Sequence, residues 1–164
     1  MLSLYNKLNS TTKMTKGIIK RSEILVHILA GKCTFTIESI KTLTHFTYKV
    51  IECKDNSELF FIYVLCGPNN TSDFKYIGTY TVAGGFKYGR KSKIAQTSLS
   101  IVSLQWVFAN LMTQRLEQVN FYHEGTCCKC GKKLTTPDSV LSGIGPVCQA
   151  YFNKLKSTLY NKNL

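Results

Sequence analysis

The sequence predicts an α+β fold, in which an antiparallel sheet of four to five strands is packed by one long helix and followed by a small cysteine-bearing unit. Three observations lead to this prediction. Short runs rich in Ile, Val, Thr, Phe and Tyr fill residues 24–88, apolar residues recur at helical spacing over 101–119, and four of the seven cysteines lie within 127–148. We therefore divide the chain into a basic flexible arm (1–22), an α+β body (23–120) and a cysteine-bearing finger with a C-terminal helix (121–164).

The expected strands are short and rich in β-branched and aromatic residues, which suit a half-buried pleated surface. They lie near residues 33–40, 44–53, 59–66, 74–82 and 86–88. Turn-forming residues such as Asp, Asn, Gly and Pro separate the second strand from the third, the third from the fourth and the fourth from the fifth. Connections this short join neighbouring strands in antiparallel order.

One long amphipathic helix is expected after the strands. Its apolar residues recur at steps of three and four, at Ile101, Leu104, Phe108, Leu111, Met112, Leu116 and Val119. Ser98 or Ser100 is a candidate N-cap, and the apolar stripe would cover one face of the sheet.

Charge and length narrow the class of protein. The 164 residues include 21 Lys and Arg against 9 Asp and Glu, a net charge of +12 that favours phosphate-rich partners. No run of apolar residues reaches the length that spans a bilayer, and crowded rather than spread cysteines are typical of a reducing compartment. We expect a cytoplasmic protein without a membrane segment, although the acid-free basic arm also has some features of an organelle transit peptide.

Cys127 and Cys130 form a C-x2-C knuckle followed by Gly131. This spacing lets two thiolates converge on one tetrahedral metal, and a glycine after the second cysteine readily adopts the left-handed conformation of the turn. Cys148 is the natural third ligand, because Pro146 suits a first helical turn and places Cys148 near a helix N-terminus. Knuckle and ligand-bearing helix together predict a treble-clef-like zinc finger.

The fourth ligand is expected to be His123, which precedes Cys127 by four residues with Gly125 between them. Cys128 or a water molecule at an open position are the alternatives. Zn²⁺ is the expected metal because a mixed N and S ligand set in tetrahedral geometry is typical of it, with iron, free thiols or a disulfide as other possibilities.

The cysteine region resembles an uncharacterised domain family found mainly in bacteriophage and bacterial proteins. The shared motif is C-x2-C-G-[RK]-x-L-T…S…G-I-G-P-x-C, carried here by Cys127, Cys130, Gly131, Lys132, Leu134, Thr135, Ser139, Gly143, Ile144, Gly145, Pro146 and Cys148. Lys132 stands where the family usually has Arg. The resemblance implies a metal-binding module of mobile-element origin and no established activity.

Catalysis is not expected. A zinc deaminase needs His-x-Glu far upstream of its cysteine pair, whereas His123 and Glu124 are adjacent and close to Cys127. The sequence contains no phosphate-cradling glycine motif and no Ser-His-Asp arrangement in a recognisable context.

A basic, glycine-flanked loop is the candidate nucleic-acid contact. Lysine and arginine alternate with aromatic residues there, a pattern that suits phosphates and stacked bases of a single strand; the predicted contacts are Lys87, Tyr88, Arg90, Lys91 and Lys93. Lys129, Lys132 and Lys133 add a second basic group beside the knuckle. The alternative is a solvated hairpin tip whose aromatic side chains return to the core.

Two functions follow from these patterns. The first is a non-catalytic zinc-binding accessory protein that binds nucleic acid in a phage or other mobile element. The second is a protein-interaction module, such as an inhibitor or adaptor, in which the zinc finger is a scaffold. Salt dependence separates them, because phosphate binding weakens steeply as salt rises.

Overall fold

The computed structural model describes residues 17–111 and 113–161 and contains one six-stranded antiparallel sheet. Its strands are β1 (Lys32–Ser39), β2 (His45–Cys53), β3 (Asn56–Leu65), β4 (Phe74–Thr81), β5 (Gly85–Tyr88) and β6 (Val119–His123), in the order β5-β4-β3-β2-β1-β6. Each pair of neighbours is antiparallel. Most of the predicted arm, residues 1–16, lies outside the described residues.

The first five strands confirm the sequence prediction, but the number of four to five strands was wrong because β6 was missed. Val119, Phe121 and His123 are buried while Asn120 and Tyr122 are half-buried, which is the alternation of a strand. The apolar helical spacing was extended through Val119 and hid this alternation. The sheet therefore includes residues 119–123, on both sides of the predicted boundary at 120.

The helix after the sheet, α3 (Leu99–Asn110), begins after Ser98 and buries Ile101, Leu104 and Val107. It is shorter than expected. The Asn110 amide donates to the Trp106 carbonyl and the Thr113 N–H to the Asn110 carbonyl, so local bonds replace the next helical turn. The chain continues as the 3-10 turn η2 (Gln114–Gln118) into β6.

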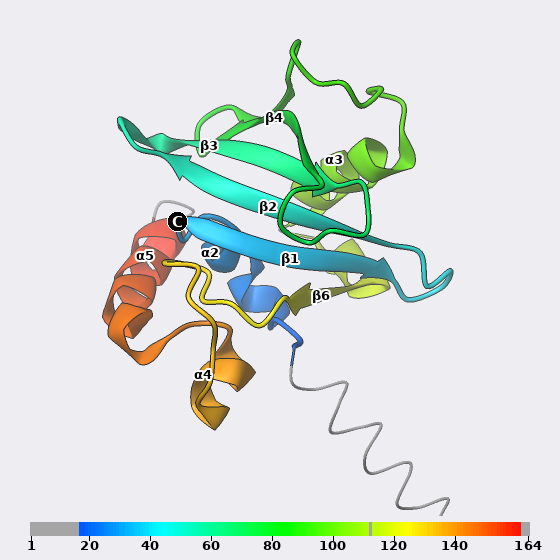
Figure 1. The fold of residues 1–164 in the computed structure, drawn as a ribbon. Coiled ribbons are helices and arrows are strands. Elements are labelled where there is room, and N and C mark those ends of the chain that lie inside the picture. Colours follow the sequence, from blue (N-terminus) through cyan, green and yellow to red (C-terminus); the bar gives the residue numbers. More distant parts are fainter. Residues whose placement is uncertain (1–16, 112, 162–164) are drawn as a thin grey trace, which may run out of the picture.

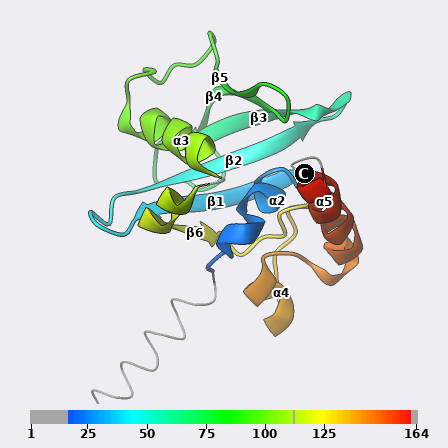
Figure 2. The ribbon, with the colours of Figure 1, turned by 180° about the vertical axis from the view of Figure 1, so that it is seen from behind.

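Helices cover one face of the sheet; they lie behind the strands in Figure 1 and in front of them in Figure 2. The short elements η1 (Arg21–Glu23) and α2 (Ile24–Ile28) join α3 on it. Phe35, Tyr48 and Ile62 point into this layer and are fully buried. The Tyr48 hydroxyl donates to the Ser100 carbonyl at 2.6 Å, which joins the sheet to α3.

The residues just before η1, expected as part of the flexible arm, lie against β6. Ile18 bridges to Tyr122, and the Ile19 N–H donates to the Phe121 carbonyl at 2.8 Å. The Arg21 guanidinium donates to carbonyl oxygens of residues 116, 117 and 119. These contacts extend the edge of the sheet.

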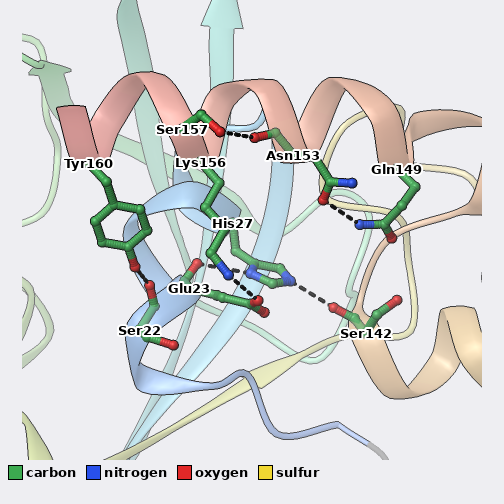
Figure 3. Close-up of polar contacts among 9 residues, drawn as sticks. All are labelled: Ser22, Glu23, His27, Ser142, Gln149, Asn153, Lys156, Ser157 and Tyr160. Carbon is green, nitrogen blue, oxygen red and sulfur yellow. Dashed lines mark hydrogen bonds and ion pairs between the residues drawn. The ribbon is translucent and has the colours of Figure 1, made fainter. Parts of the chain in front are cut away.

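We call residues 124–161, which follow β6, the C-terminal unit. It contains α4 (Pro137–Ser142), the 3-10 turn η3 (Pro146–Cys148) and α5 (Gln149–Asn161). Polar contacts join α5 to the N-terminal helical segment (Figure 3): Lys156 forms an ion pair with Glu23 at 2.9 Å, and the Tyr160 hydroxyl donates to the Ser22 carbonyl. Phe152 and Leu159 complete the attachment by entering the common core.

None of the helices in the described part of the chain is both long and apolar enough to cross a membrane.

Candidate metal centre

Three cysteines from two separate segments meet at one point in the C-terminal unit. The sulfur atoms of Cys127, Cys130 and Cys148 all lie within 4.8 Å of one another, and all seven cysteines of the chain are free thiols. Tetrahedral Zn²⁺ with bonds of about 2.3 Å to sulfur holds its sulfurs about 3.8 Å apart. A small contraction of the observed cluster therefore fits the ion.

The knuckle turn that presents Cys127 and Cys130 is held by backbone hydrogen bonds. The Gly131 N–H donates to the Cys127 carbonyl at 2.8 Å, and the Cys127 N–H donates to the Lys132 carbonyl at the same distance. Gly131 has φ +76°, the left-handed conformation that glycine adopts without strain. This confirms the role predicted for Gly131 and aims both sulfurs to the same side.

Cys148 is brought to the knuckle by the turn between α4 and α5. Pro146 starts η3, and the Cys148 N–H donates to the Gly145 carbonyl at 3.0 Å. The Gly145 N–H in turn lies 3.3 Å from the Cys127 sulfur. The G-x-P-x-C turn thus supplies one sulfur to the cluster and one hydrogen bond to another sulfur.

The electrostatics of the cluster favour a cation. Burial raises the pKa of Cys127, but hydrogen bonds from the backbone N–H groups of Gly145, Cys130 and Lys129 outweigh burial and lower it below the ordinary value. Burial, then the neighbouring Cys127 charge, raises the pKa of Cys148 to about 11. A divalent cation among the sulfurs would remove this repulsion between thiolates.

The cluster extends from the interior to the surface, because Cys127 is buried, Cys148 is half-buried and Cys130 is exposed. Cys128 is buried and is not among the three clustered sulfurs. Its backbone joins the unit to the sheet, since its carbonyl accepts from the Lys32 N–H at 2.9 Å. Burial raises the pKa of the Cys128 thiol far above its usual range.

The structure does not bring His123, the expected fourth ligand, into this cluster. Its Nε2 lies 2.7 Å from the Val140 carbonyl, and its Nδ1 accepts from the Gly125 N–H at 3.0 Å. Because a carbonyl only accepts and an N–H only donates, these contacts define a neutral imidazole with its proton on Nε2. Both ring nitrogens are thus engaged away from the cysteines.

The two buried histidines share one structural role at the end of α4. His123 binds the Val140 carbonyl, and His27 Nε2 lies 2.8 Å from the Ser142 carbonyl. Carbonyl groups in the last turn of a helix have no hydrogen-bond partner within the helix, and the two imidazoles supply that partner here. Figure 3 shows His27 reaching from α2 to Ser142.

A family of unknown function (DUF6011) matches residues 119–153. This segment runs from β6 into α5 and contains all three clustered cysteines. The match agrees with the resemblance to an uncharacterised domain that the cysteine motif indicates. Comparisons with curated proteins and with solved structures found no match.

The predicted basic loop begins within β5, which contains Lys87 and Tyr88, and continues to Lys93; its cations are exposed while its aromatic residues are half-buried. Lys87, Arg90, Lys91 and Lys93 are exposed. Tyr88 is half-buried, and its hydroxyl donates to the Ile94 carbonyl at 2.5 Å. The ring of Phe86 stacks on Phe108 of α3 with centroids 6.0 Å apart. The aromatic side chains return to the body, which is the alternative stated for this loop.

The three lysines near the knuckle differ from one another. Lys132 and Lys133 are exposed. The Lys129 ammonium lies 3.9 Å from the ring centroid of Tyr151 and 3.9 Å from a carboxylate oxygen of Glu52. Lys129 therefore connects the knuckle to α5 and to β2.

Proposed function

We propose that this protein is a non-catalytic zinc-binding accessory protein that binds nucleic acid, with Zn²⁺ held by Cys127, Cys130 and Cys148. The observation that supports the metal site is the convergence of three free thiols from two segments on one point. Thiolate ligands in tetrahedral arrangement suit Zn²⁺ better than the hard cations, which prefer oxygen.

The metal would stabilise the fold of the C-terminal unit. It would join the knuckle to the start of α5, an arrangement that we propose to be treble-clef-like. Three protein ligands would leave one coordination position of a tetrahedral ion, and Cys130 is the most exposed of the three. Water fills such a position in Zn²⁺ sites that have three protein ligands.

Nucleic-acid binding is supported by charge. The net charge is +12, and exposed cations lie on the C-terminal unit, at Lys132, Lys133 and Lys154, and along residues 87–93. Phosphates neutralise such a surface and release counterions when they bind. A role in a phage or other mobile element is what the family resemblance implies.

The second candidate is a protein-interaction module. It is favoured by two apolar side chains that project from the C-terminal unit, Val147 with 94% of its surface exposed and Leu141 with 62%. Exposed apolar residues close to a structural metal site are suited to docking on a protein partner.

Metal analysis tests the zinc site. Purified wild-type protein should contain one Zn²⁺ per chain, and the triple variant Cys127→Ser, Cys130→Ser, Cys148→Ser should contain none. The double variant Cys53→Ser, Cys66→Ser is the matched control, because these thiols lie outside the cluster. Zinc that remains at full stoichiometry in the triple variant would sink the assignment.

His123→Gln resolves the role of the histidine. Glutamine can still donate to the Val140 carbonyl but is a poor zinc ligand, so stoichiometric zinc is expected to persist. Loss of zinc in His123→Gln with retention in Cys128→Ser would instead restore His123 as the fourth ligand.

A fluorescence titration with a labelled oligonucleotide separates the two functions. Binding that weakens steeply between 50 and about 200 mM salt supports nucleic acid as the partner. Absence of binding at low salt would leave the protein-interaction module as the remaining candidate.

A further inference from the structure

The two faces of the sheet differ in what covers them. In Figure 1 the strands are seen from the side away from α2 and α3, and among the described residues no helix lies over this side. We call it the open face and define it by six residues that point away from the helices: Lys32, Lys49, Phe61, Tyr63, Tyr76 and Lys87. Their neighbours along the strands, such as Val50 and Ile62, are buried on the other face.

Aromatic side chains form the centre of the open face. Tyr63 of β3 is paired with Tyr76 of β4, and their ring centroids lie 5.9 Å apart in an edge-to-face arrangement. Phe61, two residues before Tyr63, lies on the same face. All three are half-buried rather than covered. Bases of a single strand stack on side chains placed in this way.

Lysines flank this aromatic centre on both sides. Lys49 is the β2 partner of Tyr63. One row further along the strands, Phe61 is paired with Thr79 of β4, and Thr79 is paired with Lys87 of β5. Neighbouring strands lie about 4.8 Å apart, so β1 to β5 span about 19 Å, enough for a short run of nucleotides.

Lys32 and Lys49 line one cavity of about 310 Å³ on the open face. Thr34 and Asn70 contribute polar atoms to it, and the Lys49 ammonium lies 4.1 Å from the ring centroid of Phe74. Among the described residues neither lysine forms an ion pair; the two ion pairs there use other lysines. Two ammonium groups that line one cavity and form no ion pair favour an anion between them.

The surroundings of Lys49 support this interpretation. Burial, followed by the charge of Lys32, lowers the pKa of Lys49. An anion in the cavity would attract both ammonium groups and offset the repulsion between them. One carboxylate, that of Glu124, also lines the cavity and accepts a hydrogen bond from the Thr36 hydroxyl.

We propose that the open face binds single-stranded nucleic acid, with a backbone phosphate between Lys32 and Lys49 and bases stacked on Tyr63 and Tyr76. This rests on the proposed nucleic-acid function and assigns it to the sheet, with Lys87 at the far end leading to the basic loop. A duplex does not fit as well, because its bases are stacked on one another and are not available to the tyrosine rings.

Anisotropy titrations with labelled dT12 and U12 test the lysines. In the double variant Lys32→Gln, Lys49→Gln, the slope of log K against log salt should become shallower by about 0.7 for each phosphate that the variant no longer binds. The matched control is Lys54→Gln, Lys154→Gln, which removes the same charge from the β2–β3 turn and from α5. The control should bind like the wild type.

The tyrosines should respond differently. Tyr63→Leu with Tyr76→Leu keeps apolar side chains but removes the rings, so affinity should fall about tenfold or more while the salt slope stays unchanged. Unchanged zinc content and melting temperature verify that each variant is folded. Glu124→Gln should bind at least as tightly as the wild type, because it removes a negative charge from the cavity.

These titrations distinguish failure of the surface assignment from failure of the proposed nucleic-acid function. If the wild type binds dT12 and the open-face variants match their control, the surface assignment is wrong and the nucleic-acid function stands. If the wild type binds neither oligonucleotide at 50 mM salt, the function itself fails. Equal affinity for a 12-base-pair duplex would also overturn the proposal.

A crosslinking experiment on the wild type avoids dependence on variants. Oligonucleotides that contain 4-thiouridine or 4-thiothymidine are bound, irradiated and mapped by mass spectrometry. Crosslinks are expected in peptides from β3 and β4, residues 56–65 and 74–81. Crosslinks confined to the loop at 89–98 or to the C-terminal unit would overturn the assignment to the sheet.

Discussion

The inner face of the sheet and the C-terminal unit bury different kinds of side chain. On the sheet, Phe35, Tyr48 and Ile62 have no exposed surface. In the C-terminal unit, two of the most buried side chains are the thiols of Cys127 and Cys128. Packed apolar area stabilises the first region through the hydrophobic effect, whereas in the second the knuckle and the turn before α5 meet at a sulfur cluster. We expect the sheet to persist without metal and the C-terminal unit to require it.

Metal removal should produce the largest difference between the two regions. Structural zinc contributes on the order of 10 kcal/mol to the folding of small finger peptides, so chelation should unfold residues around the knuckle and η3. Hydrogen exchange followed by mass spectrometry should show reduced protection over 126–148 and retained protection in β2 and β3. Loss of protection in both regions at the same chelator concentration would mean that they unfold as one unit.

A substitution in the core of the sheet should lower the stability of the sheet and leave the metal site intact. Ile62→Ala removes a fully buried side chain from β3 and should lower the free energy of unfolding by about 2–5 kcal/mol. Ile51→Ala on β2 is the comparison, because Ile51 is only half-buried and should cost less. Urea denaturation measures both, and zinc content should stay at one per chain. Equal losses for the two variants would contradict the difference between the faces.

Alkaline pH should weaken the sheet through Tyr48. Burial raises the pKa of Tyr48 above its usual value near 10, so the folded state retains a proton that the unfolded state loses. Stability from this residue is therefore fully present below pH 10 and lost above it, by about 1.4 kcal/mol per pH unit. Tyr48→Phe should flatten the decline between pH 10 and pH 11 in urea titrations. A wild type with constant stability over that range would exclude this account.

The smallest expected effect is at the start of α4. Thr136 is its N-cap, and its hydroxyl oxygen accepts from the Ser139 N–H, so Thr136→Ala should cost about 1 kcal/mol. Thr136→Ser keeps the cap and Thr135→Ala changes the exposed neighbour; both should be nearly neutral. Zinc-loaded protein in urea provides the measurement. A larger effect than that of Ile62→Ala would show that capping, not metal and packing, dominates the C-terminal unit.

Local patterns were sufficient for the five strands of the β-rich region, because alternation and turn residues act over a few neighbouring positions. The three cysteines were also predictable, since the C-x2-C spacing and the proline before Cys148 determine the local turns. Pattern reasoning failed at residues 111–123. There, Leu116 and Val119 continue a helical period by chance, while the chain has left the helix at Asn110 and entered β6.

His123 shows a different limit. Its distance in sequence from Cys127 suits a zinc ligand, and nothing in the sequence shows that Val140 lies in the last turn of a short helix beside it. The contact with Val140 crosses 17 residues, and that of His27 with Ser142 crosses 115. Unpaired carbonyls at a helix end are visible only once the helix has been placed.

The sequence by itself determined the α+β class, the cysteine knuckle and the strong positive charge, because composition and short spacings express local chemistry. Only the tertiary structure decided that β6 joins the sheet edge and that His123 binds α4. It also decided that Lys32 and Lys49 share a cavity while the aromatic residues of the basic loop turn inward. These outcomes depend on strand register and on which face of the sheet the helices cover, and both are set by packing between residues far apart in the chain.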